Sequence, residues 1–321
     1  MSLPVYFAPL EGVTDSAYRR VHRAHFCGIA KYFIPFISPT QTLTLTTREL
    51  SNVSPEYNAG VPVVPQVLTK NADHFIWAAQ QLYDMGHMEV NLNTGCPSGT
   101  VTAKGKGAGM LLHVPELEWF LDDVFSRCPM AISIKTRIGY ASPEEFERLL
   151  ALFSRYPLRE LIIHPRTREQ FYKGTPYRDV YAQALKDTRL PVVYNGDLFT
   201  ADGCGAFERD YPGTSALMLG RGMLANPALA QQYTGGAPLT RESLRAFHDD
   251  LLREYLERYP RNVVVARLRE VMKNVACSFE NNAKPLKAVR KASNLAQYED
   301  AVNRLFNECE MSAVPQFIPE A

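Results

Sequence analysis

The sequence lacks the features that mark several common classes of protein. Its 321 residues include six cysteines but no CxxC pair, so neither a zinc site nor a disulfide framework is indicated, and free thiols in a reducing compartment are expected. It has no run of eighteen apolar residues and no basic leader followed by an apolar segment, which favours a soluble, cytoplasmic protein. The formal net charge is only +1, so the overall charge predicts no partner.

Short apolar runs are abundant, and apolar residues make up 46% of the chain. Eight runs bounded by Gly, Pro or polar residues lie at 5–10, 29–38, 61–69, 88–95, 130–139, 160–167, 191–197 and 216–222. Most are separated by stretches with helical periodicity, although the Thr-rich stretch 39–60 is compatible with a helix or an extended loop. No GxGxxG follows the first run, which argues against a doubly wound sheet. We therefore predict an α/β fold, a (β/α)8 TIM barrel.

The pattern changes after the turn sequence TGGAP at 234–238, because the rest of the chain is helical in character. We predict a catalytic barrel over residues 1–235 and a small C-terminal all-helical domain over residues 239–321.

The helical tail is locally basic. Between Arg261 and Lys291 eight Lys or Arg residues stand against two acids. A helix over 284–294 would place Lys284, Lys287 and Lys291 on one face. Such a face is typical of a solvated surface or of one that binds phosphates.

Polar side chains stand at or near the ends of most apolar runs. In a TIM barrel these ends meet at one mouth, where the chemistry is located. The residues are Glu11, Gln66, Asn93, Cys96, Lys135, Arg137, His164, Arg166, Asn195, Asp197 and Arg221. Each has a structural explanation of its own, but burying so many polar groups in one ring is costly unless a polar ligand satisfies them.

The end of the eighth run indicates a phosphate. Gly220 lets the backbone approach a ligand, and Arg221 can bind a phosphate through its planar fork. The loops after strands seven and eight are the usual phosphate site of TIM barrels. Together with Gln66, Lys135 and His164, this site fits flavin mononucleotide (FMN), and Lys135 would stabilise negative charge on the reduced flavin.

Cys96 lies in a glycine-rich loop behind the fourth run. A free cysteine has a pKa of about 8.5 and is mostly protonated at neutral pH, so it can be a nucleophile, an acid or inert. No histidine is near it in sequence to act as a base, which favours the acid. A thiol there could protonate one carbon of a C=C bond while a hydride adds to the other.

The stretch NTGCPSGTVTAKGKGAGMLL (93–112) resembles the signature of the tRNA-dihydrouridine synthases. Further segments resemble the other motifs of this family and follow in the family's order. They are FAPLEGVTD (7–15), PQVLT (65–69), SIKTRIG (133–139), IIHPRTREQFYKG (162–174), VVYNGDL (192–198) and MLGRGMLANP (218–227). The helical tail corresponds to the C-terminal domain of the family.

The resemblance implies reduction of the C5–C6 double bond of uridines in tRNA. Reduced FMN would deliver hydride to C6, Cys96 would protonate C5, and NADPH would reduce the flavin again. The implied FMN contacts are Pro9, Leu10, Gln66, Lys135, His164, Asn195, Asp197, Gly220 and Arg221. The implied substrate contacts are Asn93, Arg137 and Tyr172 around the base, with Lys284, Lys287 and Lys291 on the RNA. We expect a monomer that has no metal site and does not bind membranes.

Three positions depart from the family pattern: Asn91 replaces an acidic residue, Gly99 a lysine and Pro165 a glycine. The change at position 99 bears on the placement of the RNA, and Lys104 or Lys106 could supply the missing charge.

Three other functions remain open. A flavin barrel acting on a free pyrimidine or another small activated alkene would not need the basic tail. A Schiff-base aldolase would use Lys135 as its nucleophile. A non-catalytic RNA-binding protein would have no need of Cys96.

Overall fold

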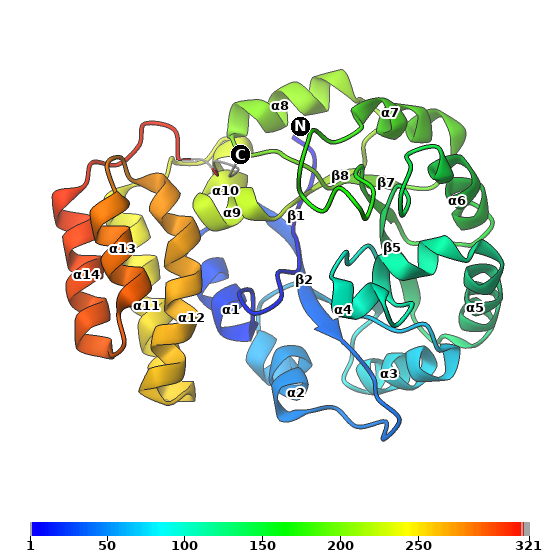
Figure 1. The fold of residues 1–321 in the computed structure, drawn as a ribbon, viewed down its shortest axis with the longest axis horizontal. Helices are drawn as coiled ribbons and strands as arrows, with labels where there is room; N and C mark the ends of the chain where they lie inside the picture. Colours follow the sequence, from blue (N-terminus) through cyan, green and yellow to red (C-terminus); the bar gives the residue numbers. More distant parts are fainter. Residues whose placement is uncertain (1, 316, 318–321) are drawn as a thin grey trace.

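A closed barrel of eight parallel strands forms the larger part of the molecule (Figure 1). The computed structural model describes residues 2–315 and 317. The strands are β1 Val5–Phe7, β2 Ile29–Ile37, β3 Val63–Val67, β4 Glu89–Thr94, β5 Ala131–Arg137, β6 Leu161–His164, β7 Val192–Tyr194 and β8 Ala216–Leu219. They pair in chain order, and β8 closes the barrel against β1. The predicted TIM barrel is confirmed, and every strand lies within a predicted apolar run.

Helices surround the barrel in chain order (Figure 1). They are α1 Ser16–His25, α2 Thr47–Val53, α3 Ala72–Asp84, α4 Gly99–Thr102, α5 Val114–Arg127, α6 Glu145–Phe153, α7 Arg178–Asp187, α8 Ala201–Asp210, α9 Arg221–Ala225 and α10 Leu229–Tyr233, with 3-10 turns η1 Pro55–Asn58 and η2 Gly107–Leu112. The ambiguous stretch 39–60 contains both a loop and α2. Helix α2 begins with a capping box, in which Thr46 and Glu49 satisfy each other's backbone N–H groups.

The lumen of the barrel has an apolar side and a polar side. The apolar side is a cluster of Tyr6, Ala8, Phe33, Val64, Ile162, Val193, Ala216 and Met218. The polar side is built by β4 and β5, whose register pairs Asn91 with Ser133 and Asn93 with Lys135. Because side chains alternate along a strand, these two polar pairs share the inward face.

Four helices follow the barrel, and the first of them packs against α1 (Figure 1). They are α11 Arg241–Arg258, α12 Arg261–Val275, α13 Ala283–Lys291 and α14 Leu295–Glu308, with η3 Ala276–Ser278. The ring of Phe247 in α11 packs edge-on against the ring of Tyr18 in α1, with 5.6 Å between the ring centroids. The predicted helix over 284–294 ends earlier, at Lys291, because the Asn294 side chain accepts from the N–H of Gln297 and starts α14 there.

Asp15 joins the barrel to these helices. Its carboxylate caps α1 by accepting from the N–H of Tyr18, at 2.9 Å. The same carboxylate receives Nη1 of Arg267 in α12 at 2.6 Å and the hydroxyl of Tyr255 in α11 at 3.3 Å. The ion pair is largely buried, so removal of either partner would leave the other charge buried without compensation and would lower the stability of the protein.

Replacement of Asp15 should therefore destabilise the protein in two separable steps. Asp15→Asn keeps a side chain that can cap α1 but leaves Arg267 without its anion, and we expect a loss of about 3 kcal/mol of unfolding free energy. Asp15→Ala also removes the cap and should lose about 1 kcal/mol more. Urea unfolding measures both variants. Asp73→Asn, at an exposed ion pair in the first turn of α3, is the control and should change stability by less than about 1 kcal/mol. Equal stability of Asp15→Asn and wild type would contradict the role of this ion pair.

Candidate active site

Two adjoining cavities open at the carboxyl ends of the strands. The larger has a volume of about 330 Å³, the smaller about 70 Å³, and both are lined by Pro9, Leu10, Lys135, His164 and Tyr172. Gln66, Asn93, Cys96 and Arg137 line only the larger cavity, and Asn195, Asp197, Gly220 and Arg221 only the smaller. Every cofactor or base contact that the resemblance implied in the barrel thus lines one cavity or both, whereas Arg166 lines neither. Lys284, Lys287 and Lys291 lie elsewhere, exposed on α13.

The turn that carries Cys96 is held from two neighbouring strands. Oδ1 of Asn93 accepts from the N–H groups of Gly95 and Cys96, at 3.0 and 2.9 Å. Nε of Arg137 donates to the carbonyl of Gly95 at 3.0 Å. Gly107, with φ of +56°, packs behind the turn, where a Cβ would lie 2.9 Å from the carbonyl oxygen of Cys96. These contacts fix the direction in which the thiol leaves the backbone.

A chain of hydrogen bonds in the lumen orients the amide of Asn93. Its Nδ2 donates to Oε1 of Gln66 at 2.8 Å, and Nε2 of Gln66 donates to Oδ1 of Asn91 at 2.7 Å. Nδ2 of Asn91 then donates to Oγ of Ser133, which donates to Oε1 of Glu89. Asn91 both accepts and donates, which an ionised carboxylate cannot do. The departure from the family pattern at this position therefore has a clear local role.

Burial and neighbouring charge set the protonation of the central groups. Burial lowers the pKa of Lys135 to about 7, and the charge of Arg137 adds to this effect. The pKa of His164 is held well below its usual value of 6.5, first by burial and then by the surrounding cations, Arg137 foremost. His164 is therefore a neutral imidazole at pH 7, whereas Lys135 stands near its midpoint.

The smaller cavity carries an excess of positive charge. Asp197 supplies the one carboxylate among its described lining residues, and both Arg166 and Arg221 form ion pairs with it. Lys135 adds a further cation when it is protonated. The guanidinium group of Arg221 in the lining, that of Arg166 behind it and the ammonium group outweigh the one carboxylate in charge. An anion is therefore favoured here, and the donor set fits a phosphate-bearing cofactor such as FMN.

Tyr172 lies at the boundary of the two cavities. Its ring lies 4.8 Å from the guanidinium carbon of Arg221 and 5.4 Å from that of Arg137. Half of the side chain remains exposed. A flat, partly exposed ring between two cations is suited to contact a planar ligand that enters from solvent.

Several residues of the site were not predicted. Phe36, Leu224 and Phe199 line the cavities but lie in apolar stretches that look like ordinary core sequence. Arg166 was noted at the end of its strand without a role; it is fully buried, binds Asp197 and donates to the carbonyl of Gly174 at 2.6 Å. Its hydrogen bonds show that it positions Asp197.

Arg168, and not Lys104 or Lys106, lies next to position 99, where glycine replaces the lysine of the family pattern. A Cβ on Gly99 would lie 4.0 Å from Nη2 of Arg168, which donates to Oγ1 of Thr102 at 3.2 Å. Lys106 instead donates to Oγ of Ser38 at 3.3 Å, and Lys104 is exposed. The cation beside the Cys96 loop at this point is therefore Arg168.

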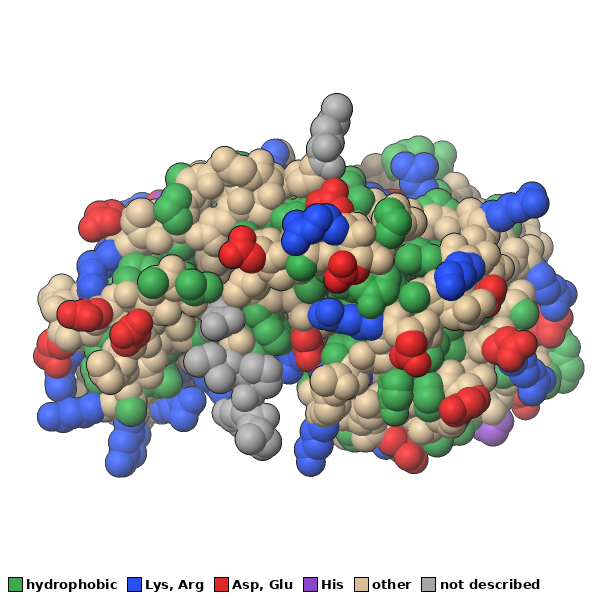
Figure 2. Space-filling model, turned by 90° about the horizontal axis from the view of Figure 1, so that it is seen from above, with side chains coloured by type: hydrophobic (Ala, Val, Ile, Leu, Met, Phe, Trp, Pro, Cys, Tyr) green, Lys and Arg blue, Asp and Glu red, His purple; other side chains and the backbone are tan. Residues whose placement is uncertain are grey.

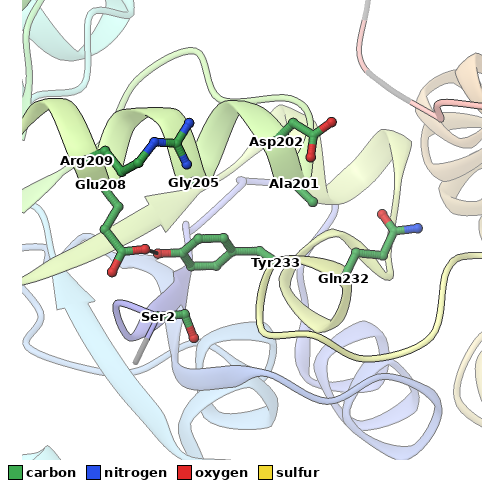
Figure 3. Close-up of a pocket in the computed structure, with 8 residues that line it drawn as sticks. All are labelled: Ser2, Ala201, Asp202, Gly205, Glu208, Arg209, Gln232 and Tyr233. Carbon is green, nitrogen blue, oxygen red and sulfur yellow. Dashed lines mark hydrogen bonds between the residues drawn. The ribbon is translucent and has the colours of Figure 1, made fainter.

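A separate groove of about 530 Å³ lies between α8, α10 and the start of the chain (Figure 3). Its polar groups bind one another: the hydroxyl of Tyr233 donates to Glu208 at 2.6 Å and accepts from the N–H of Leu3. None of the predicted site residues lines this groove. The hydrogen bond between Leu3 and Tyr233 anchors the chain just before β1.

The barrel, the cationic smaller cavity and the thiol beside it fit the class of TIM-barrel oxidoreductases that use a flavin. Solved structures share the fold. Morphinone reductase superposes with a TM-score of 0.53 at 14% identity, over 76% of this chain and 88% of its own. The structure of TcOYE with pHBA gives a TM-score of 0.54 at 11% identity, over 80% of this chain and 95% of its own.

Sequence comparison identifies the family. The family model "Dihydrouridine synthase (Dus)" matches residues 6–316. The probable tRNA-dihydrouridine synthase of Rhodobacter capsulatus is 26% identical over 96% of both chains. The tRNA-dihydrouridine(16) synthase of Escherichia coli is 31% identical over 71% of this chain and 74% of its own. The chain belongs to the dihydrouridine synthase family, and the resemblance predicted from its motifs is confirmed.

Within the described residues, 2–315 and 317, no helix is long and apolar enough to cross a membrane. The same part of the chain contains no group of three or more His, Cys, Asp or Glu arranged to hold a metal ion.

The lowered pKa of Lys135 predicts a stability that depends on pH. Between pH 7 and 10.5 the unfolded chain keeps the proton that the folded, flavin-free protein releases, so this lysine costs stability as the pH falls through that window. Lys135→Met should therefore raise the melting temperature of flavin-free protein at pH 7, with a smaller gain at pH 9.5. The same variant should bind FMN more weakly, because a cation facing the ligand is lost.

Differential scanning fluorimetry at the two pH values measures the effect, with Lys70→Met, an exposed lysine, as the control. A gain in melting temperature that is the same at pH 7 and pH 9.5 would mean that Lys135 titrates normally.

Proposed function

We propose that this protein reduces uridines in tRNA to 5,6-dihydrouridine with bound FMN, and that NADPH returns the flavin to its reduced state. The observation that carries the proposal is that Cys96, held on a fixed turn, lines the same cavity as Lys135 and His164. Membership in the dihydrouridine synthase family supports the reaction, and the names of the curated relatives support tRNA as the substrate.

The residues of the smaller cavity are suited to the phosphate end of FMN. Arg221 and the backbone at Gly220 would bind the phosphate, with Asn195 and Asp197 beside them. Nδ2 of Asn195 donates to the carbonyl of Met218, which leaves its Oδ1 free to accept. Arg166 would keep Asp197 in place.

The residues shared by the cavities are suited to the flavin ring. Lys135, His164, Pro9 and Leu10 would contact it, together with Gln66 of the larger cavity. Bound and reduced, FMN would supply the hydride that adds to C6 of uracil. A negative charge near Lys135 would raise its pKa again and keep the ammonium protonated.

Cys96 would supply the proton. Its S–H bond breaks as the hydrogen joins C5 of uracil, and the thiolate that remains regains a proton from solvent. The positive charge of Lys135, close enough to interact with Cys96, would stabilise this thiolate. Asn93 keeps one N–H uncommitted for the uracil, and Tyr172 would cover the base.

The C-terminal helices would hold the RNA. Lys284, Lys287 and Lys291 are exposed on α13, and Lys and Arg side chains gather along the lower left edge of the molecule over this end (Figure 2). We therefore assign catalysis to residues 1–235 and RNA binding to residues 239–321. Phosphate contacts of this kind fix the position of the nucleic acid without reading its sequence.

Loss of the acid tests the reaction. Unmodified tRNA incubated with protein, FMN and NADPH should acquire dihydrouridine at a discrete position, found by mapping the modified nucleotide. Cys96→Ala should slow its formation at least about 100-fold, the usual contribution of a general acid. Cys27→Ala, at an exposed thiol, is the matched control and should retain the wild-type rate. Reduction of free uracil but of no tRNA uridine would favour the small-molecule flavin barrel instead.

Charge reversal on α13 tests the RNA grip. Lys284→Glu, Lys287→Glu and Lys291→Glu together should raise the KM for tRNA and flatten its dependence on salt, because each lost phosphate contact removes about 0.7–0.9 from the logarithmic slope. Flavin binding should not change. Lys186→Glu, at an exposed lysine of α7 in the barrel, controls for a charge reversal away from α13, and each single α13 variant is compared with it. An unchanged salt slope in the triple variant would show that tRNA binds elsewhere.

A further inference from the structure

Phe171 has a backbone conformation that a bulky residue rarely adopts. It lies in the loop between β6 and α7 with φ of +52°, in the left-handed region that favours glycine. The loop enforces this conformation: Thr167 donates its N–H to the side chain of Gln170 at 2.8 Å, and Phe171 donates its own N–H to the carbonyl of Arg168 at 3.1 Å. Strain of this kind persists where the surroundings over-determine it, commonly at ligand-binding positions.

The ring of Phe171 is held on one side by a cation. The guanidinium carbon of Arg168 lies 4.9 Å from the centre of this ring and 5.2 Å from that of Tyr140. Arg168 is in turn fixed to Thr102, in the short helix that follows Cys96. Tyr140, Arg168 and Phe171 thus form a stack, called the rim stack below, beside the loop that carries the thiol.

The rim stack ends in solvent. Phe171 is 39% exposed, and in the part of the chain that the structure describes no second aromatic ring lies against it. Its neighbour Tyr172, about 3.8 Å away along the chain between Cα atoms, lines both cavities of the site. The strained residue therefore presents an apolar, flat surface at the edge of the active site.

We propose that Phe171 is a stacking platform for the nucleobase next to the uridine that is reduced. This inference rests on the proposed function. A uridine that enters the cavity must leave its stack, so the adjacent base loses a partner. An aromatic ring at the cavity edge replaces that partner without regard to which base it is, because every base has a flat π face. Arg168 orders the ring before the RNA arrives.

Three substitutions at this position separate stacking from bulk and strain. Phe171→Trp keeps an aromatic face, Phe171→Leu keeps an apolar side chain without one, and Phe171→Gly removes both the ring and the strained φ. Tyr83→Leu, an exposed ring on α3, is the matched control. Each full-length, FMN-loaded variant is tested with one unmodified tRNA transcript for its Kd by fluorescence anisotropy, for single-turnover dihydrouridine formation at saturating tRNA, and for its melting temperature.

Stacking predicts that Phe171→Leu and Phe171→Gly bind tRNA about tenfold more weakly, whereas Phe171→Trp and Tyr83→Leu bind like the wild type. The indole added in Phe171→Trp should lose fluorescence when tRNA binds, beyond any change in the wild-type protein. The melting temperature of Phe171→Gly should equal or exceed that of the wild type, since glycine relieves the strain.

The proposal is overturned if Phe171→Leu binds tRNA as tightly as Phe171→Trp, or if Phe171→Gly melts lower while its affinity is unchanged, because the ring would then serve only the fold. If the wild-type protein forms dihydrouridine, either of these results refutes only the stacking role of Phe171 and leaves the proposed function standing. A wild-type protein that binds FMN and modifies no tRNA would instead refute the proposed function.

Discussion

The side-chain amide of Asn93 is the contact on which the site depends. Its oxygen receives two backbone N–H groups from the Cys96 turn, and its nitrogen donates into the hydrogen-bond chain that runs down the lumen to Glu89. An amide rotated by half a turn would present N–H to N–H at the turn, and buried donors left without acceptors are costly. The lumen therefore determines the direction of a thiol that lies at the barrel mouth.

The second constraint is electrostatic. Lys135, Arg137, Arg166 and Arg221 surround a neutral His164, and Asp197 offsets only part of their charge. An arrangement of this kind lowers the stability of the protein without a ligand and favours an anion that enters it. Burial first, and then the charge of Arg137, lowers the pKa of Lys135 in this setting, and an anion bound beside it would raise that pKa again.

The sequence predicted the architecture well, for identifiable reasons. Strands buried on both faces read as continuous apolar runs, and parallel topology alone brings the polar residues that follow them to one mouth. Apolar cavity residues such as Phe36 and Phe199 could not be separated from core residues, because only the closed barrel shows that a space lies beside them. The backbone conformation of Phe171 could not be predicted either, because it depends on hydrogen bonds within its loop and not on the preference of phenylalanine.

The loop between β1 and α1 connects the two cavities to the C-terminal helices. At its start Leu10 lines both cavities, and its carbonyl accepts from the N–H groups of Val13 and Thr14. The loop ends at Asp15, which is bound by Arg267 of the C-terminal helices. Because both ends of so short a segment are hydrogen-bonded, a shift of α12 would be transmitted to the cavity wall at Leu10. Under the proposed function, RNA bound on α13, which packs against α12, would be coupled through this segment to the cavity that would hold the flavin.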